Sequence, residues 1–122
     1  MTGLTPYPVS GKVTFRGKPI VDATVVLHPV TKPSEEDNFF LPRGNVLSDG
    51  SFRLTTYNSH DGAPAGDYKV TFDWTGSHEG LDEDEIDARK QILPRKYTSP
   101  DTSEFVVTIS EGANKLDTFK LR

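Results

Sequence analysis

An Asp-Gly pair separates two short runs of apolar and β-branched residues in Val46-Leu47-Ser48-Asp49-Gly50-Ser51-Phe52-Arg53-Leu54-Thr55. Glycine tolerates the positive φ angle that a tight turn requires, so this pattern predicts a β-hairpin with arms over residues 43–47 and 51–56. A second turn, around Gly66, leads into the stretch 68–74, where large apolar residues alternate with polar ones. Such alternation is typical of a strand with one face buried and the other in water.

Residues 9–16 show the same alternation before the hairpin, with Val9, Val13 and Phe15 on one face. Gly11 falls on this apolar face, where we expect it to let a ring or another backbone approach closely. A turn then follows, and we expect Ile20 to tuck back toward the core. The N-terminal part of the chain therefore predicts one long strand with a single buried face.

Three further strands are expected from alternating or β-branched runs, over residues 23–29, 105–109 and 115–121. Leu116 is out of phase with the apolar residues that follow it, which predicts a bulge or an early bend. Between the fifth and sixth strands, residues 81–93 favour one short helix, because acids precede bases and Pro94 stops it. This helix lies in an insertion of about residues 76–96 and is expected to cover one edge or end.

At 122 residues the chain fits one domain, 1–122, with no room for two independent cores. Seven short strands at this spacing predict an all-β fold, a Greek-key β-sandwich with one short helix inserted between strands five and six. An apolar fraction of 34% agrees with a sandwich, because alternate strand residues face water.

The charge balance and the residue counts disfavour several classes of function. Fourteen basic residues against eighteen acidic ones give a net charge of -4, which makes binding to nucleic acid a poor expectation. The absence of cysteine excludes disulfides, thiolate catalysis and cysteine zinc sites. No apolar run approaches the roughly 18 residues of a membrane-spanning helix, so no transmembrane segment is expected.

Catalytic and metal chemistry have little support in the pattern. His60-Asp61 is the only local pair of a histidine and an acid, and in a Gly- and Ser-rich loop a solvated pair is the better interpretation. The acids of residues 82–87 could attract calcium, but a solvated first turn of the helix explains them better. Lys12 and Asn114 could form an isopeptide bond, although the polar parity of Lys12 favours a surface lysine. We therefore expect no catalytic residue, no cofactor and no metal site.

Four aromatic side chains are candidates for contact with a ligand or partner: Phe39, Phe40, Tyr57 and Trp74. Two adjacent phenylalanines in a long loop either cap the open end of the sandwich or form an exposed apolar contact. Tyr57, Trp74 and the pair Phe39-Phe40 would suit a sugar platform if the loops bring them together. Trp74 continues the apolar parity of its strand, which favours a place in the core or at its rim.

Several motifs resemble those of carboxypeptidase regulatory-like domains, which have a transthyretin-like fold. Val9-Ser10-Gly11-Lys12-Val13-Thr14-Phe15-Arg16-Gly17-Lys18-Pro19-Ile20 with Ala23-Thr24-Val25-Val26-Leu27 looks like their opening G-x-V-T-x-x-G-x-P-I/L-x-x-A-x-V. Ser48-Asp49-Gly50-Ser51-Phe52-Arg53-Leu54 is similar to their T-D-x-D-G-x-F hairpin in shortened form. Pro64-Ala65-Gly66-Asp67-Tyr68-Lys69-Val70 is similar to their P-G-x-Y-x-V strand. The resemblance covers most of the chain and implies a transthyretin-like sandwich.

A narrower resemblance is to small secreted or lipid-anchored proteins of planctomycete bacteria. It rests on Leu93-Pro94-Arg95-Lys96-Tyr97, Thr102-Ser103 and Gly112-Ala113-Asn114. In such proteins a signal peptide ending in a lipidated cysteine precedes the domain, so the resemblance implies an extracytoplasmic location at the cell envelope and a lipid anchor upstream. Residues 1–6 lack the charged and apolar regions of a signal peptide. These motifs are turns and core positions, which specify a fold and leave the activity open.

The expected function is a non-enzymatic, extracytoplasmic β-sandwich module for protein interaction or structural support at the cell envelope. The alternative is a carbohydrate-binding module that uses loop or edge aromatics, and a hydrolase or metal-binding protein comes after it. Transthyretin-like folds include a hydrolase of 5-hydroxyisourate, but that family ends in Tyr-Arg-Gly-Ser, whereas this chain ends in Phe119-Lys120-Leu121-Arg122. The partner, a protein or a glycan, and the oligomeric state stay open.

Overall fold

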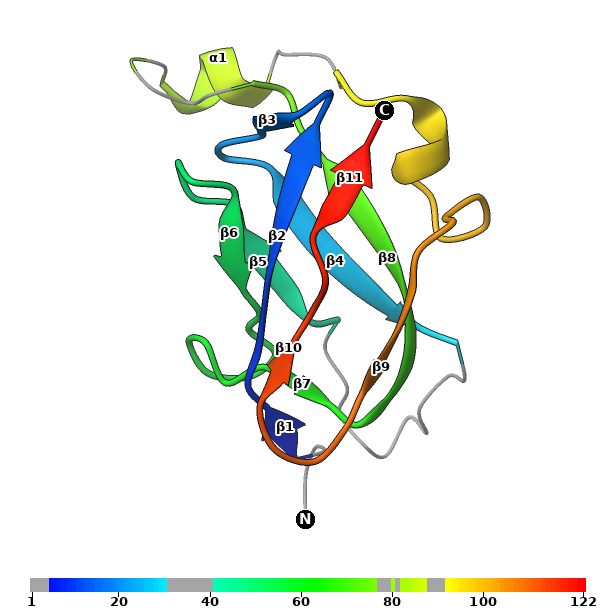
Figure 1. Cartoon of the computed structure of the whole chain (residues 1–122). Helices are drawn as coiled ribbons and strands as arrows, with labels where there is room; N and C mark the ends of the chain where they lie inside the picture. Colours follow the sequence, from blue (N-terminus) through cyan, green and yellow to red (C-terminus); the bar gives the residue numbers. More distant parts are fainter. Residues whose placement is uncertain (1–4, 31–40, 77–79, 81, 88–91) are drawn as a thin grey trace.

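The structure, a computed structural model, describes residues 5–30, 41–76, 80, 82–87 and 92–122. These residues form eleven strands, one α-helix and one 3₁₀ helix (Figure 1). In chain order they are β1 (Pro6–Tyr7), β2 (Val9–Phe15), β3 (Lys18–Pro19), β4 (Thr24–Pro29), β5 (Arg43–Asn45), β6 (Ser51–Arg53), β7 (Ala63–Pro64), β8 (Gly66–Asp73), α1 (Glu83–Asp87), η2 (Arg95–Tyr97), β9 (Val106–Ile109), β10 (Asn114–Lys115) and β11 (Phe119–Leu121).

One sheet is built around β2, the long first strand. On one side β2 pairs in parallel with β10 and β11, which follow one another along it, and on the other side it pairs antiparallel with β6 and β3. Figure 1 shows β2 and β11 side by side with their arrows pointing the same way. The central strand of this sheet therefore connects the two ends of the described chain.

The second sheet is antiparallel and has the order β5-β4-β8-β9. Its centre is the six-residue ladder between β4 and β8, in which Val25 lies opposite Phe72. A small two-stranded sheet, β1 with β7, closes the end at which β8 begins. The domain is thus mostly β, with open sheets that face each other across one core.

The core is formed by apolar residues that alternate along the strands of both sheets. Phe72, Phe105 and Phe119 pack edge to face, with ring centroids 5.3 to 5.9 Å apart, and Phe52 stacks on Phe119 at 6.3 Å. Each such pair contributes roughly 0.5–1.5 kcal/mol beyond the area that it buries. Ile20 is fully buried, as expected from the sequence. Among the residues under 2% exposed that fill the centre are Val13, Ile20, Val25, Leu27, Val46, Phe52, Leu54, Val70, Phe72 and Leu121.

The predicted turn at Asp49-Gly50 is present, but its arms do not form one hairpin ladder. Gly50 has a φ of +87°, and the Leu47 amide donates to the Ser51 carbonyl at 2.8 Å. The arms stay close along their length, because Arg43 and Thr55 exchange two backbone hydrogen bonds, of 3.0 and 2.7 Å, at the far end. Each arm nevertheless forms its ladder with another strand, β5 with β4 in one sheet and β6 with β2 in the other. The prediction is confirmed for the turn and for the antiparallel approach of its arms, but the turn connects the two sheets at a corner.

Gly11 has the role that its parity predicts. A Cβ atom at this position would lie 2.8 Å from Cζ of Phe52 and 3.4 Å from Cβ of Leu116. Only a residue without a side chain leaves room for the Phe52 ring here. Leu116 itself lies in the break between β10 and β11, where the sequence predicts a bend.

The seven-strand Greek-key count is not confirmed. Several of the eleven strands have two or three residues, and the last predicted strand, 115–121, is divided into β10 and β11. The helix expected over 81–93 is described only over Glu83–Asp87, and residues 92 and 93 are not helical. Leu93 is nevertheless buried, and η2 follows it, where the sequence predicts only turns.

Candidate functional site

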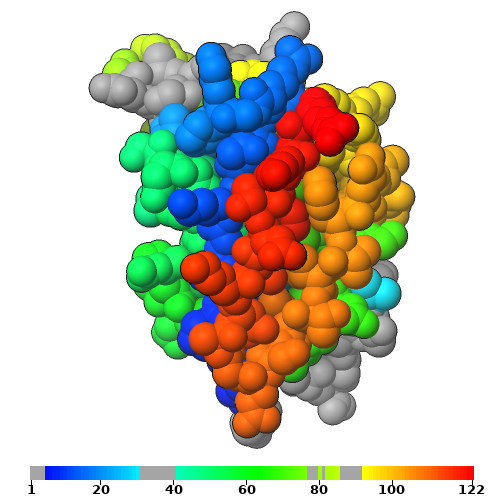
Figure 2. All heavy atoms as spheres, viewed as in Figure 1, coloured from blue at the N-terminus to red at the C-terminus, as the bar shows by residue number. Residues whose placement is uncertain are grey.

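The outer face of the β2 sheet has a cleft of about 590 Å³. It arises because alternate residues of β2 point outward, so that Ser10 and Lys12 face solvent while Gly11 and Val13 are buried. Figure 2 views this side of the molecule, with β2 in blue beside β10 and β11 in orange and red. We name this cleft the basic groove, after Lys12, Arg53, His60 and Lys115 on its walls.

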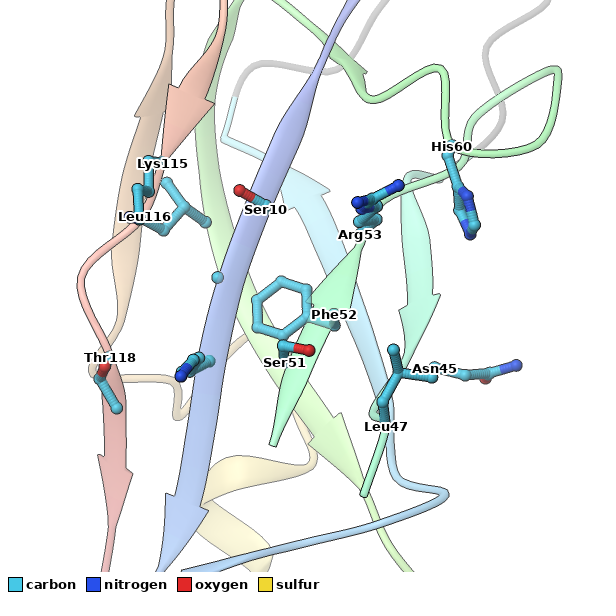
Figure 3. Close-up of a pocket in the computed structure, with 12 residues that line it drawn as sticks. Ser10, Asn45, Leu47, Ser51, Phe52, Arg53, His60, Lys115, Leu116 and Thr118 are labelled. Atoms are coloured by element: carbon cyan, nitrogen blue, oxygen red, sulfur yellow. The ribbon is translucent and has the colours of Figure 1, made fainter. Parts of the chain in front are cut away.

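Strand pairing sets two of these cations on either side of a serine. In the two ladders, Ser10 lies opposite Arg53 of β6 and beside Lys115 of β10. Since neighbouring strands are about 4.8 Å apart, the Cα atoms of Arg53 and Lys115 are separated by roughly 10 Å. Figure 3 shows Lys115, Ser10, Arg53 and His60 following one another across the face. The positive charges of Lys115 and Arg53 therefore lie on either side of the Ser10 hydroxyl.

The cations of the groove are not neutralised by carboxylates of the described residues. The only ion pair in that part of the chain joins Lys96 and Glu104, at 3.4 Å. Of the residues that the structure describes, no Asp or Glu lines the groove. Asp49 lies near Lys12, but its pKa is lowered first by Ser51, which donates its hydroxyl at 2.6 Å and its amide at 2.9 Å, and only then by Lys12. The groove is a positively charged surface on an acidic chain.

Two adjoining hollows extend the basic groove in opposite directions. One, of about 380 Å³, shares Ser10, Arg53, His60 and Lys115 with it and reaches Asn114. The other, of about 410 Å³, shares Arg53 and His60 and adds Arg43 of β5. Neither of these hollows is lined by Asp or Glu. Together they form an open run from β10 across β2 and β6 to β5.

His60 lies on a loop that Asp61 holds in place. The two carboxylate oxygens of Asp61 accept backbone N–H groups from Thr56 at 2.7 Å, Tyr57 at 3.0 Å and Asn58 at 2.9 Å. Burial works to raise the pKa of Asp61, but these three donors together hold it below its usual value. The carboxylate is therefore engaged by the backbone, and a general base oriented by Asp61 has no geometric support.

His60 itself has a φ of +59°, which is uncommon for a residue with a side chain. Its amide donates to Oγ1 of Thr55 at 2.9 Å, which helps to hold this conformation. Such a conformation persists only where surrounding contacts enforce it, and it is found more often at functional sites. Here it places the imidazole at the junction of the three hollows.

The structure places Trp74 at the rim of the core. Its indole N–H donates to the Val21 carbonyl at 2.9 Å, and its ring meets Phe15 edge to face at 6.2 Å. The side chain is half-buried and packs against the core cluster. Phe39 and Phe40, the other predicted contact pair, lie outside the described residues.

Tyr57 and Trp74 are not brought together. Tyr68 lies near the start of β8, and its pKa is raised to about 12. Burial is the larger cause and the nearby Tyr57 is the smaller one, so Tyr57 lies close to Tyr68. Trp74 follows the other end of β8. Six residues of extended strand separate Tyr68 from Trp74, which is roughly 20 Å. A shared sugar platform made of Tyr57 and Trp74 is therefore not formed.

The other sequence candidates also have defined places. Asp82 accepts the Glu85 amide at 2.8 Å, so it caps α1, and the described acids 82–85 are exposed. Lys12 is exposed, and the Asn114 side chain bonds Ser110 within its own turn. In the described part of the chain, no three His, Cys, Asp or Glu residues converge as a metal site, and no helix is long and apolar enough to cross a membrane.

The basic groove is the feature that the sequence patterns did not identify. Its signal was present in the polar parity of residues 9–16, where Ser10 and Lys12 face outward. Arg53 and Lys115 lie on segments far away in sequence, and only strand pairing brings them beside Ser10.

No family model matches the chain, and none of the curated proteins is similar to it in sequence. Among solved structures, the chain is similar to a DUF3823 family protein from Parabacteroides merdae, with 12% sequence identity and a TM-score of 0.47. The match covers 93% of this chain and 45% of that one, so the chain spans less than half of the length of the structure it matches.

Proposed function

We propose that this protein is a non-enzymatic β-sandwich module that acts by binding a partner, and that the basic groove is its binding face. The observation that supports this is the convergence of Lys12, Arg53 and Lys115 on one cleft without an ion-pair partner among the described residues. Mutual repulsion of like charges is a cost to the folded chain, which a bound anion would relieve. The chain as a whole has a net charge of -4, so a local cluster of positive charges favours recognition of an anionic partner at this face.

The absence of catalysis is part of the same proposal. Asp61 is occupied by three backbone amides, so His60 lacks the acid partner that would orient it as a base. His28, on the outer face of the other sheet, contacts Oγ1 of Thr71 at 2.8 Å, and burial lowers its pKa. In the described part of the chain, no carboxylate forms an ion pair or a hydrogen bond with His28 or His60, so neither has the orienting acid of a catalytic base.

The location at the cell envelope is proposed from the resemblance to carboxypeptidase regulatory-like domains and to lipid-anchored planctomycete proteins. Fractionation of cells that express the full-length protein is expected to recover it with the envelope. Recovery in the cytoplasmic fraction would contradict this part of the proposal and would leave the binding face untouched.

Binding at the groove is tested with two polyanions, poly-L-glutamate and oligogalacturonate, by NMR titration of backbone amides. We expect the largest shifts along Ser10, Arg53 and Lys115, and we expect Arg53→Glu/Lys115→Glu to reduce them strongly at equal concentrations of the polyanion. The matched control is Lys18→Glu/Arg95→Glu, which makes the same change in charge outside the groove and its two adjoining hollows. The proposal fails if neither polyanion perturbs the groove, or if the two double variants behave alike.

A further inference from the structure

We infer that the ligand of the basic groove is an acidic oligosaccharide, a chain of sugars that carries carboxylate or sulfate groups. This inference rests on the proposed function and specifies the chemistry of the partner. It follows from the charge and the length of the groove and from the hydroxyl and amide groups among its walls.

The length of the groove indicates a chain and not a single ion. Three hollows of about 590, 410 and 380 Å³ meet at Arg53 and His60, and the run they form is open along the surface. Arg43, Arg53 and Lys115 follow one another along this run. Lys12 lies on β2 two residues beyond Ser10, on the same face. A small anion would occupy one gap between neighbouring cations, whereas a chain with repeated negative groups would meet all of them.

The walls of the groove carry hydroxyls and an amide beside the cations, together with the apolar Leu47, Phe52 and Leu116. Ser10, Thr118 and Asn45 line the groove, and their polar side-chain atoms form no hydrogen bond with any other described group. A hydroxyl and a carboxamide each donate and accept, which matches the hydroxyl groups of a sugar. Cations on the same wall suit the acid groups of the same chain. This combination favours a sugar acid over a purely ionic ligand.

An acidic peptide fits less well. Extended peptides commonly bind by adding a strand to a free sheet edge, where backbone hydrogen bonds provide affinity. The centre of the groove lies across the face of β2, which is paired on both sides, with β6 and with β10. A peptide that crosses this face would be held there by side chains alone, and strand addition would be open to it only at the outer strands β5, β6 and β10.

The inference also corrects how the chain would recognise a glycan. The sequence suggests aromatic platforms, but Tyr57 and Trp74 lie near opposite ends of β8. The ring that underlies the groove, Phe52, is only 1% exposed, so it offers no stacking surface. Recognition would depend on charge and hydroxyl contacts, and it would weaken as salt is added.

The test compares four probes by isothermal titration calorimetry: an oligogalacturonate of about six sugars, its methyl-esterified form, a heparin-derived hexasaccharide and poly-L-glutamate. We expect one or both acidic oligosaccharides to bind, the esterified form to bind at least tenfold more weakly, and poly-L-glutamate to bind more weakly than the better sugar. Each exposed ion contact is modest, so Arg53→Glu/Lys115→Glu should weaken sugar binding roughly tenfold, whereas Lys18→Glu/Arg95→Glu should not. The two acidic sugars distinguish carboxylate from sulfate as the preferred group.

The outcomes separate the two proposals. If poly-L-glutamate binds the groove and neither acidic sugar does, the inference is overturned and the proposed binding face stands. If the esterified sugar binds as well as the acid, charge is not the basis of recognition and the inference is again overturned. If no probe binds, or if the groove variants bind like the wild type, the proposed function fails together with the inference. Circular dichroism of each variant verifies that the fold is intact.

Discussion

Replacement of Gly11 by alanine tests the close packing between β2 and the Phe52 ring of β6, since Phe52 is the partner of Gly11 in the ladder of that sheet. The new Cβ atom would lie 2.8 Å from Cζ and 3.2 Å from Cε1 of Phe52, a ring that is 1% exposed and stacks on Phe119. Favourable carbon contacts begin at about 3.5 Å, so the ring or the strand must shift by roughly 0.7 Å. Overpacking of this kind costs about 1–3 kcal/mol. Alanine returns about 0.4–1 kcal/mol by restricting the unfolded chain.

The expected net effect of Gly11→Ala is a loss of roughly 1–2 kcal/mol in the free energy of unfolding. Urea denaturation followed by circular dichroism measures it, with the midpoint compared at constant slope. Ser10→Ala, on the outward face of the same strand, is the control and should change stability by no more than about 0.5 kcal/mol.

The decisive comparison repeats Gly11→Ala in a Phe52→Leu background. Leucine lacks the ring atoms that the new methyl group would meet, so the cost of the alanine should fall by about half or more, which would appear as a coupling of roughly 0.5–1 kcal/mol. The reasoning is refuted if Gly11→Ala is as stable as the wild type, or if its cost is the same in both backgrounds.

Three further predictions concern single polar groups. Asp61→Asn should lose roughly 1–2 kcal/mol at neutral pH, because an amide presents one acceptor oxygen to three backbone donors. Since the pKa of Asp61 is lowered on folding, this contribution exists above the ordinary carboxyl pKa and is lost as the pH falls through the lowered one, so urea midpoints of wild type and variant should converge in acid. Tyr68, whose hydroxyl donates to the Pro64 carbonyl at 2.7 Å, has its pKa raised to about 12, so its share of stability is complete below pH 10 and is lost between there and 12. An absorbance titration of tyrosinate should show one late phase that Tyr68→Phe removes, and the assignment is wrong if the variant keeps it. Trp74→Phe removes the donor to the Val21 carbonyl and should cost about 1 kcal/mol by urea denaturation, and an unchanged midpoint would show that this bond contributes nothing.

Local features of the fold were predictable because they depend on neighbours in sequence. The alternation of residues 9–15 and 66–73 places Val13 and Phe72 in the core by strand periodicity alone. Gly11 on an apolar face predicted a close approach, and Gly50 predicted a turn. In each case the residue type and its place in the alternation of the strand are enough to predict the feature.

Features that depend on pairing between distant segments could not be obtained in the same way. Nothing within residues 43–56 indicates that β5 joins β4 while β6 joins β2, because both arms have ordinary strand patterns. The helical pattern of 81–93 extends over positions 92 and 93, yet the buried Leu93 is outside any helix, so a tertiary contact outweighs local propensity there.

The same limit applies to the candidate site. Lys12, Arg53 and Lys115 are separately ordinary surface cations in the sequence, and their meaning depends on the registers that set Ser10 between Arg53 and Lys115. Residue type alone marks Tyr57 and Trp74 as candidates for a shared platform, whereas the length of β8 between Trp74 and Tyr68, the neighbour of Tyr57, keeps the two apart. The sequence signal for the groove is a charged residue at an outward-facing position of the central strand, as Lys12 is in β2.

The parallel pairing of β2 with β10 and β11 has a consequence for how the protein is made. Val9 and Val13 contact strand partners that lie about a hundred residues later, at Asn114 and Phe119. Contacts this distant in sequence slow folding, because a long loop must close before they form. A growing chain that has not yet reached Phe119 presents an incomplete edge of β2 and an uncovered Phe52 ring. The nascent domain therefore depends on its final segment, and premature termination before β11 should yield a chain prone to aggregation.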